Sequence, residues 1–104
     1  MGEKTTNHNV TLDPQEIKTF CEKHHIAKLS LFGSILTDRF TPDSDVDILV
    51  EFVPGCTPGF LQMAALEAEL SAMLHRKVDL RTPAELSKYF RDDVLSKREI
   101  HYGF

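Results

Sequence analysis

The sequence has only two cysteines, no long apolar run and no excess of positive charge, and each shortage excludes a class of protein. Cys21 and Cys56 are too few for a disulfide framework and lack the spacing of a zinc site, which favours a reducing, cytoplasmic environment. The apolar runs are far too short to span a membrane. The polar stretch 1–12 does not have the pattern of a secretory signal.

The charge balance argues against a general nucleic-acid binder. Sixteen Asp and Glu residues outnumber twelve Lys and Arg residues, for a net charge of -4, whereas proteins that bind nucleic acids usually carry a basic excess. An anionic ligand would therefore need local groups or a metal to hold it. A chain of 104 residues is the size of one domain. We expect a flexible N-terminal tail over residues 1–11 and a single domain over 12–104.

Helical and extended patterns alternate along the expected domain. Asp13, Pro14 and Glu16 form a helix start signal ahead of an apolar stripe with helical spacing. Thr82, Pro83 and Glu85 repeat that signal later in the chain. Helices are predicted at 12–25, 60–76, 82–90 and 93–102, with one or two helical turns at 35–40, and strands at 26–32, 45–52 and 77–82. Glu67 and Glu69 are expected to face outward from the helix 60–76. This order predicts an α/β (α+β) fold with a small mixed sheet flanked by helices.

The predicted topology gathers three carboxylates beside a Gly-Ser pair. Period-2 alternation in the strand 45–52 places Asp45 and Asp47 on one face, with apolar side chains on the other. The link from Phe32 is short, so an antiparallel return should bring Gly33-Ser34 next to the aspartates. A helical crossover makes the following strand parallel, which should bring Asp79 to the same edge.

Mutually repelling carboxylates need a compensating charge, and Mg²⁺ prefers oxygen ligands while leaving positions open for phosphates. A Gly-Ser turn offers backbone N–H groups to a phosphate without a bulky side chain in the way. Together they point to phosphoryl or nucleotidyl transfer. Taken alone, the D-x-D pattern or the G-S pair is weak, because such aspartates are often solvated or cap a turn. The conjunction of G-S, ten residues, D-x-D and a later strand aspartate is much more specific.

Three segments, LFGS, PDSDVDILVEF and RKVDLRTP, resemble the minimal nucleotidyltransferase (MNT) domains of the DNA polymerase β-like superfamily. The resemblance covers residues 14 to 102. It implies that Gly33 and Ser34 hold the triphosphate of ATP and that Asp45 and Asp47 bind Mg²⁺. Asp79 is implied as the third carboxylate and as the base for the attacking hydroxyl.

The resemblance also implies a biological role. Small MNT proteins of this kind pair with a HEPN-domain ribonuclease toxin, and they neutralise it by transferring AMP from ATP to a toxin tyrosine. We therefore expect a protein adenylyltransferase that acts as an antitoxin in a hetero-oligomer with its toxin. A chain this short leaves no room for a separate tRNA- or drug-binding domain, which fits a protein substrate.

One departure from the family pattern leaves alternatives open. Many relatives carry an arginine directly after the Gly-Ser pair, whereas this chain has Ile35-Leu36-Thr37 and its nearest basic residue is Arg39. A second hypothesis is therefore an antitoxin with a weak or inactive site that works by binding alone. A third, less favoured, is transfer to a small molecule or RNA. The alternatives for Lys88 and Arg91 are a contact with phosphate or a partner and, as is usual for a mixed-charge helix face, simple solvation.

Overall fold

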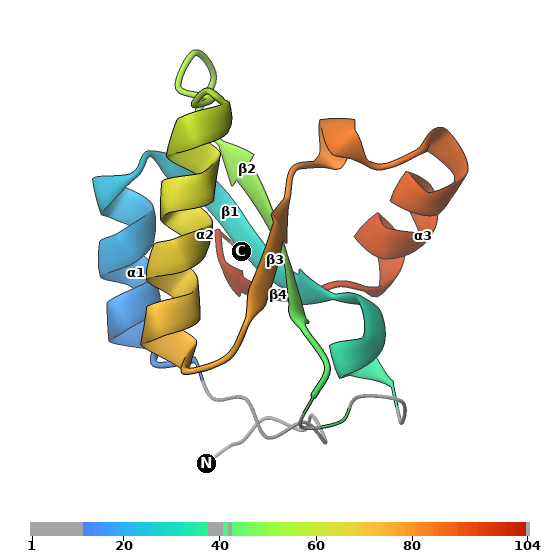
Figure 1. Ribbon diagram of the computed structural model, residues 1–104. Coiled ribbons are helices and arrows are strands. Elements are labelled where there is room, and N and C mark those ends of the chain that lie inside the picture. Colours follow the sequence, from blue (N-terminus) through green and yellow to red (C-terminus); the bar gives the residue numbers. More distant parts are fainter. Residues whose placement is uncertain (1–11, 38–40, 42, 104) are drawn as a thin grey trace.

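The computed structural model describes residues 12–37, 41 and 43–103, so the tail expected over 1–11 lies outside the described residues. Helices and strands alternate as the sequence predicts (Figure 1). In chain order the elements are α1 (Pro14–Lys23), β1 (Ile26–Phe32), the 3₁₀ turn η1 (Gly33–Leu36), β2 (Val46–Phe52), α2 (Phe60–Leu74), β3 (Val78–Arg81), the 3₁₀ turn η2 (Pro83–Glu85), α3 (Lys88–Lys97) and β4 (Glu99–Tyr102). Within this described part, no helix has the length and apolar character needed to cross a membrane.

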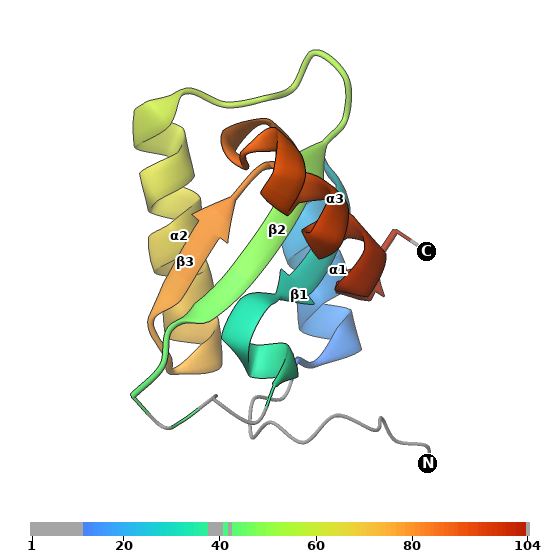
Figure 2. The same cartoon turned by 90° about the vertical axis from the view of Figure 1, so that its right-hand side faces the viewer.

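The strands form one mixed sheet in the order β3-β2-β1-β4. β1 pairs antiparallel with β2 and with β4. β2 and β3 are parallel neighbours, and the chain passes from one to the other through helix α2. Helices α1 and α2 cover one face of the sheet, and α3 lies over the other (Figures 1 and 2). This arrangement confirms the predicted fold class, an α/β (α+β) fold with a small mixed sheet. The prediction that β2 has an antiparallel neighbour on one side and a parallel neighbour on the other is also confirmed.

Alternation along β2 sends side chains into two separate cores. Val46, Ile48 and Val50 are fully buried with α1 and α2, while Leu49 is buried on the other face, in a small cluster with Val94 of α3. Covering both faces of a central strand excludes water from the backbone around it. The start of β2, where Asp45 and Asp47 lie, is therefore built on a buried and rigid strand.

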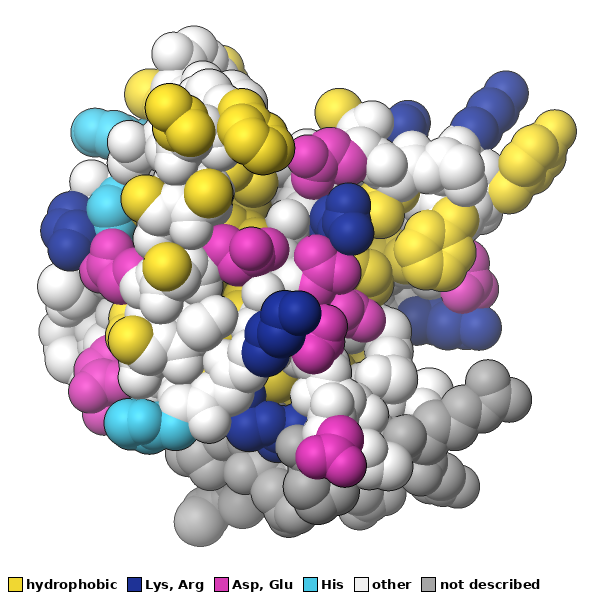
Figure 3. All heavy atoms as spheres, viewed as in Figure 1, with side chains coloured by type: hydrophobic (Ala, Val, Ile, Leu, Met, Phe, Trp, Pro, Cys, Tyr) yellow, Lys and Arg dark blue, Asp and Glu magenta, His cyan; other side chains and the backbone are white. Residues whose placement is uncertain are grey.

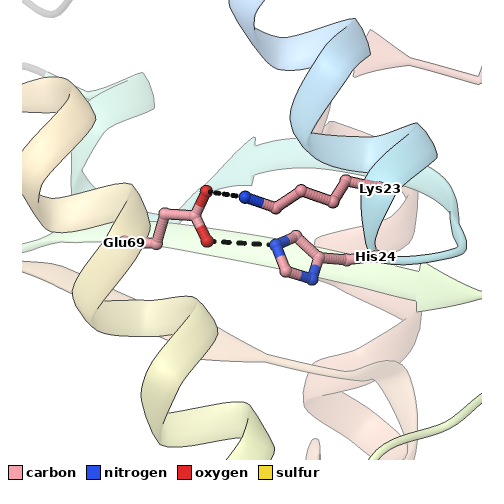
Figure 4. Close-up of polar contacts among 3 residues, drawn as sticks. All are labelled: Lys23, His24 and Glu69. Carbon is pink, nitrogen blue, oxygen red and sulfur yellow. Dashed lines mark hydrogen bonds and ion pairs between the residues drawn. The ribbon is translucent and has the colours of Figure 1, made fainter.

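A polar contact joins the two helices of the larger core (Figure 4). Glu69 of α2 accepts a hydrogen bond from Lys23 Nζ at 3.0 Å and contacts His24 Nε2 at 3.0 Å. The sequence pattern puts Glu67 and Glu69 on the outer face of α2, but Glu67 instead accepts a hydrogen bond from the backbone N–H of Leu80 at 2.8 Å. It thereby satisfies a donor on the edge strand β3, and the expectation that it faces outward is wrong.

Two predicted helices differ from the structure at the C-terminal end. The helix expected over 93–102 ends at Lys97, and residues 99–102 form β4 beside β1. The helix expected over 82–90 is interrupted, because the capping box of Thr82 and Glu85 starts only the short turn η2. Ser87 then caps α3 separately. These changes fold α3 back over the sheet instead of letting it run on into solvent.

Gly33, at the junction of β1 and η1, has a backbone conformation that other residues rarely adopt. Its φ is +81°, in the left-handed region that favours glycine. A Cβ at this position would overlap Oδ2 of Asp47 and lie 3.2 Å from its Cγ. Gly55 has nearly the same φ, +84°, but a Cβ there would meet nothing within 4 Å. Gly33 is therefore needed for space as well as for conformation, unlike Gly55; the same holds for Gly103 (φ +85°), where a Cβ would overlap the backbone carbonyl oxygen of Ala27.

We predict that Gly33→Ala destabilises the fold more than Gly55→Ala. Both variants force alanine into the left-handed region, at about 1–2 kcal/mol, but only Gly33→Ala adds an overlap, which typically costs about 1–3 kcal/mol more. Denaturant unfolding measures both values. Adding Asp47→Ala to Gly33→Ala should recover the excess. Equal costs for the two glycine variants would contradict the close approach of Asp47.

Candidate nucleotidyl-transfer site

Asp47 lies where three elements meet. On β2 it pairs with Phe32, the last residue of β1, and on the other side with Asp79 of the parallel strand β3. Gly33 approaches its carboxylate directly. Asp45 is exposed and immediately precedes the first residue of β2. The structure thus brings Asp47 to Gly33 and Asp79, as the topology predicted, with Asp45 at the strand entrance.

The carboxyl group of Asp47 is in an environment that opposes its negative charge. The pKa of Asp47 is raised from 3.8 to about 6, mainly by burial and then by the negative charges of Asp79 and Asp45, while the positive charge of Arg81 acts in the opposite direction. Repulsion by neighbouring carboxylates and loss of hydration both favour the protonated form. The site therefore carries negative charge that nearby cations do not fully compensate.

Asp79 has a cation of its own. Oδ1 of Asp79 lies 3.1 Å from Nε of Arg81, and Nη2 of Arg81 donates to Oδ2 at 3.3 Å. In the part of the chain that the structure describes, no three His, Cys, Asp or Glu side chains are already grouped to hold a metal ion. The oxygen donors and the excess negative charge at Asp47 nonetheless fit Mg²⁺, with Asp45 beside it. Figure 3 shows acidic side chains gathered between α2 and α3, with Lys or Arg side chains next to them.

A cleft of about 640 Å³ opens beside Gly33 and Ser34. One wall is the end of β1 with η1, and the other is α3, which contributes Phe90, Asp93, Val94 and Lys97. Its volume lies within the usual range for a small-molecule site. The predicted nucleotide-binding pair thus lines a cleft of adequate size. The sequence suggested Lys88 and Arg91 of this helix as candidates to reach phosphate. It did not single out Asp93 and Lys97, because their only local signal is an ordinary i,i+4 charge pair.

The two basic residues proposed from the sequence on α3 do not line this cleft. Arg91 is structural: Nε donates to the carbonyl of Pro83 at 2.8 Å, and Nη2 donates to that of Leu86 at 2.9 Å. These bonds satisfy carbonyls at the break between η2 and α3. Lys88 is exposed at the first position of the helix.

The chain is similar in sequence to a known domain family and to individual proteins. The nucleotidyltransferase domain model matches residues 15–101. The protein adenylyltransferase MntA of Thermococcus cleftensis is 35% identical over 85 residues, 82% of this chain and 82% of that protein. MJ0128 of Methanocaldococcus jannaschii is 43% identical over 63 residues, which make up 61% of this chain but only 62% of that relative.

Solved structures show the same fold. A crystal structure of a toxin–antitoxin with AMP-PNP matches with a TM-score of 0.72 at 22% identity, over 89% of this chain and 75% of that one. An AMPylated Shewanella oneidensis HEPN toxin in complex with its MNT antitoxin matches with a TM-score of 0.64 at 22% identity, over 88% and 70%. With a family model over residues 15–101 and the strand aspartates beside Gly33-Ser34, this chain belongs to the nucleotidyltransferase domain family.

Proposed function

We propose that this chain is a Mg²⁺-dependent protein adenylyltransferase that transfers AMP from ATP to a tyrosine of a HEPN ribonuclease toxin, and so acts as its antitoxin. The position of Asp47 is the observation that carries the proposal. Its carboxylate, with a raised pKa, lies between Gly33 and Asp79. The relatives support it, because one is named a protein adenylyltransferase and another complex holds an AMPylated HEPN toxin. Residues 12–104 would act as one catalytic domain, in the cytoplasm.

Each site residue then has a role in the reaction. Asp45 and Asp47 would hold Mg²⁺, with Asp79 as the third carboxylate, and Gly33 and Ser34 would hold the triphosphate in the cleft against α3. When bound, Mg²⁺ supplies positive charge that stabilises the transferring phosphoryl group and its leaving group. Because Gly33 has no side chain, the phosphates can approach the backbone closely.

The transfer forms one P–O bond and breaks another. The tyrosine oxygen attacks the α-phosphorus of ATP, and the bond to the β-phosphate oxygen breaks to release pyrophosphate. A tyrosine hydroxyl has a free pKa of about 10 and must lose its proton during the attack. Asp79 would take this proton as general base. In the structure this carboxylate contacts Arg81 through an ion pair.

Exposed apolar side chains support a protein as the acceptor. Phe60 and Leu61, at the start of α2, are 85% and 81% exposed, and Tyr89, at the start of α3, is 89% exposed. Apolar side chains protrude over these two helices on the face that also carries the acidic cluster (Figure 3). Large exposed aromatic groups are typical of protein contacts. A protein acceptor fits this surface better than a small molecule does.

Two observations favour a second candidate, an antitoxin that acts by binding alone. The residues of η1 after Gly33-Ser34, Ile35 and Leu36, supply no cation, and Arg39, the nearest basic residue in the sequence, lies outside the described residues. Asp79 is also engaged by Arg81. Both features would lower the rate of transfer without affecting an interface. Separating the two candidates requires a variant that leaves the surface intact and removes only the proposed base.

We predict that Asp79→Asn binds Mg²⁺-ATP and the toxin but transfers no AMP. The amide keeps the shape of the carboxylate but cannot accept the tyrosine proton. Intact-mass spectrometry of the HEPN protein, incubated with this chain, ATP and Mg²⁺, measures the transfer, and co-expression measures rescue from toxicity. Asp92→Asn, on the exposed surface of α3, is the matched control and should remain active. Full rescue by Asp79→Asn, with no AMP on the toxin, would favour the binding-only candidate.

We also predict that Asp47→Asn abolishes Mg²⁺-dependent ATP binding while raising stability at neutral pH. The folded-state pKa of Asp47, about 6, lies above its ordinary value of 3.8. The native state therefore binds more protons than the unfolded state between these values, and its stability falls as pH rises through that window. At pH 7 without metal the variant should be more stable than the wild type by about 1–2 kcal/mol, allowing for solvent screening.

The pH dependence separates this effect from a general stabilisation. Below pH 4 the wild-type side chain is protonated, and the advantage of Asp47→Asn should vanish in thermal unfolding measurements. Adding Mg²⁺ at pH 7 should stabilise the wild type but not the variant. Asp92→Asn serves again as the control for the loss of one surface charge. Unchanged ATP binding by Asp47→Asn would exclude this carboxylate from the site.

A further inference from the structure

The turn that follows β1 has no cation of its own among the described residues. Ile35 is 2% exposed in the core, Leu36 packs against it, and the Thr37 hydroxyl donates to the carbonyl of Ser34 at 2.9 Å. A triphosphate next to Gly33 and Ser34 would bring several negative charges to a chain whose net charge is -4. Arg39 lies outside the described residues, so among the described residues positive charge in addition to that of Mg²⁺ would have to come from another element that lines the cleft.

Lys97 is the single basic side chain among the described residues that line the cleft. It lies in the last turn of α3, on the wall that faces Gly33 and Ser34. Its Nζ is 3.0 Å from Oδ1 of Asp93, one helical turn earlier, and Asp93 lines the same cleft. The two side chains are 71% and 55% exposed, so their ion pair is weak and can exchange for a more highly charged anion.

The neighbouring residues hold this end of α3 against the sheet. The side chain of Val94 is buried with Phe32 and Leu49. Arg98, directly after Lys97, pairs with Glu51 of β2 at 2.5 Å, and its side chain is only 14% exposed. The backbone N–H of Arg98 closes the helix by donating to the carbonyl of Val94 at 2.9 Å. The backbone of Lys97 is therefore fixed beside the cleft, while its ammonium group stays free to change partners.

We propose that Lys97 binds the β- and γ-phosphates of the nucleotide, supplying the positive charge that η1 lacks, and that Asp93 is its partner before the nucleotide binds. The inference rests on the proposed function, and it makes Lys97 the residue that gives the site its specificity for a nucleoside triphosphate. Lys97 exchanges Asp93 for phosphate oxygens when ATP binds. It then neutralises the pyrophosphate that leaves after transfer, so that ATP is preferred over nucleotides with fewer phosphates.

Calorimetric titration of the full chain with ATP, ADP and AMP in Mg²⁺ tests the assignment. Lys97→Met keeps the length of the side chain and removes its charge, and its ATP affinity should fall about tenfold or more, as expected for one charge-assisted contact. Its AMP affinity should change less than about twofold by the same reasoning. Asp93→Asn frees Lys97 and should tighten ATP binding. Lys88→Met, on the same helix but outside the cleft, should behave as the wild type.

The outcomes separate this inference from the proposed function. If the wild type binds ATP and Lys97→Met binds it equally well, or loses ATP and AMP affinity in parallel, the role of Lys97 is wrong while the proposed function survives. Weaker ATP binding by Asp93→Asn would overturn the restraining role of Asp93. If the wild type binds no ATP at all, the proposed function fails and takes this inference with it. Matching thermal unfolding of the variants confirms that each is folded.

Discussion

The close approach of Gly33 to the carboxylate of Asp47 is the constraint on which the rest of the site depends. Phe32 pairs with Asp47 at the end of β1, and the chain must then turn away without colliding with that side chain. A left-handed glycine makes the turn and leaves the space that the carboxylate fills. The end of one strand, the start of the next and a half-buried charge are thereby fixed in one place.

That arrangement also explains why the site is acidic and under electrostatic stress. Placing Asp47 against the glycine buries part of its carboxylate, and the parallel register of β2 and β3 puts Asp79 directly alongside. The raised pKa of Asp47, about 6, reflects both effects. A protein that needed only a stable strand could have a neutral residue here. The unfavourable charge is useful if a divalent cation binds, because its affinity gains from relieving the same repulsion.

Most of this geometry could be predicted from the sequence, because it follows from local patterns. The start signal at Asp13, the alternation along β2 and the crossover helix were enough to place Gly33, Asp47 and Asp79 together. The Arg81 partner of Asp79 was also within reach, since residues two apart on a strand share a face.

The C-terminal part could not be predicted in the same way. Residues 99–102 continue a helix-compatible pattern, and their strand conformation arises from pairing with β1, about 70 residues earlier in the chain. The break after Glu85 depends on carbonyls that Arg91 satisfies from the following helix. Both are tertiary effects with weak local signals. These two tertiary effects decide where α3 lies, so the position of Lys97 beside the cleft could not be predicted from the sequence either.

Two described cations beside the site, Arg81 and Lys97, each have a carboxylate partner. Arg81 is paired with Asp79 and Lys97 with Asp93, whereas Asp47 forms no ion pair with another described residue. Both pairs are largely exposed, so each is worth little on its own and is exchanged at small cost. Arrival of a nucleotide with its metal would give Asp47 a cation and give Lys97 a stronger anion at once. The cation that Asp47 lacks and the stronger anion that Lys97 can accept would therefore come from the same ligand, the complex of metal and nucleotide.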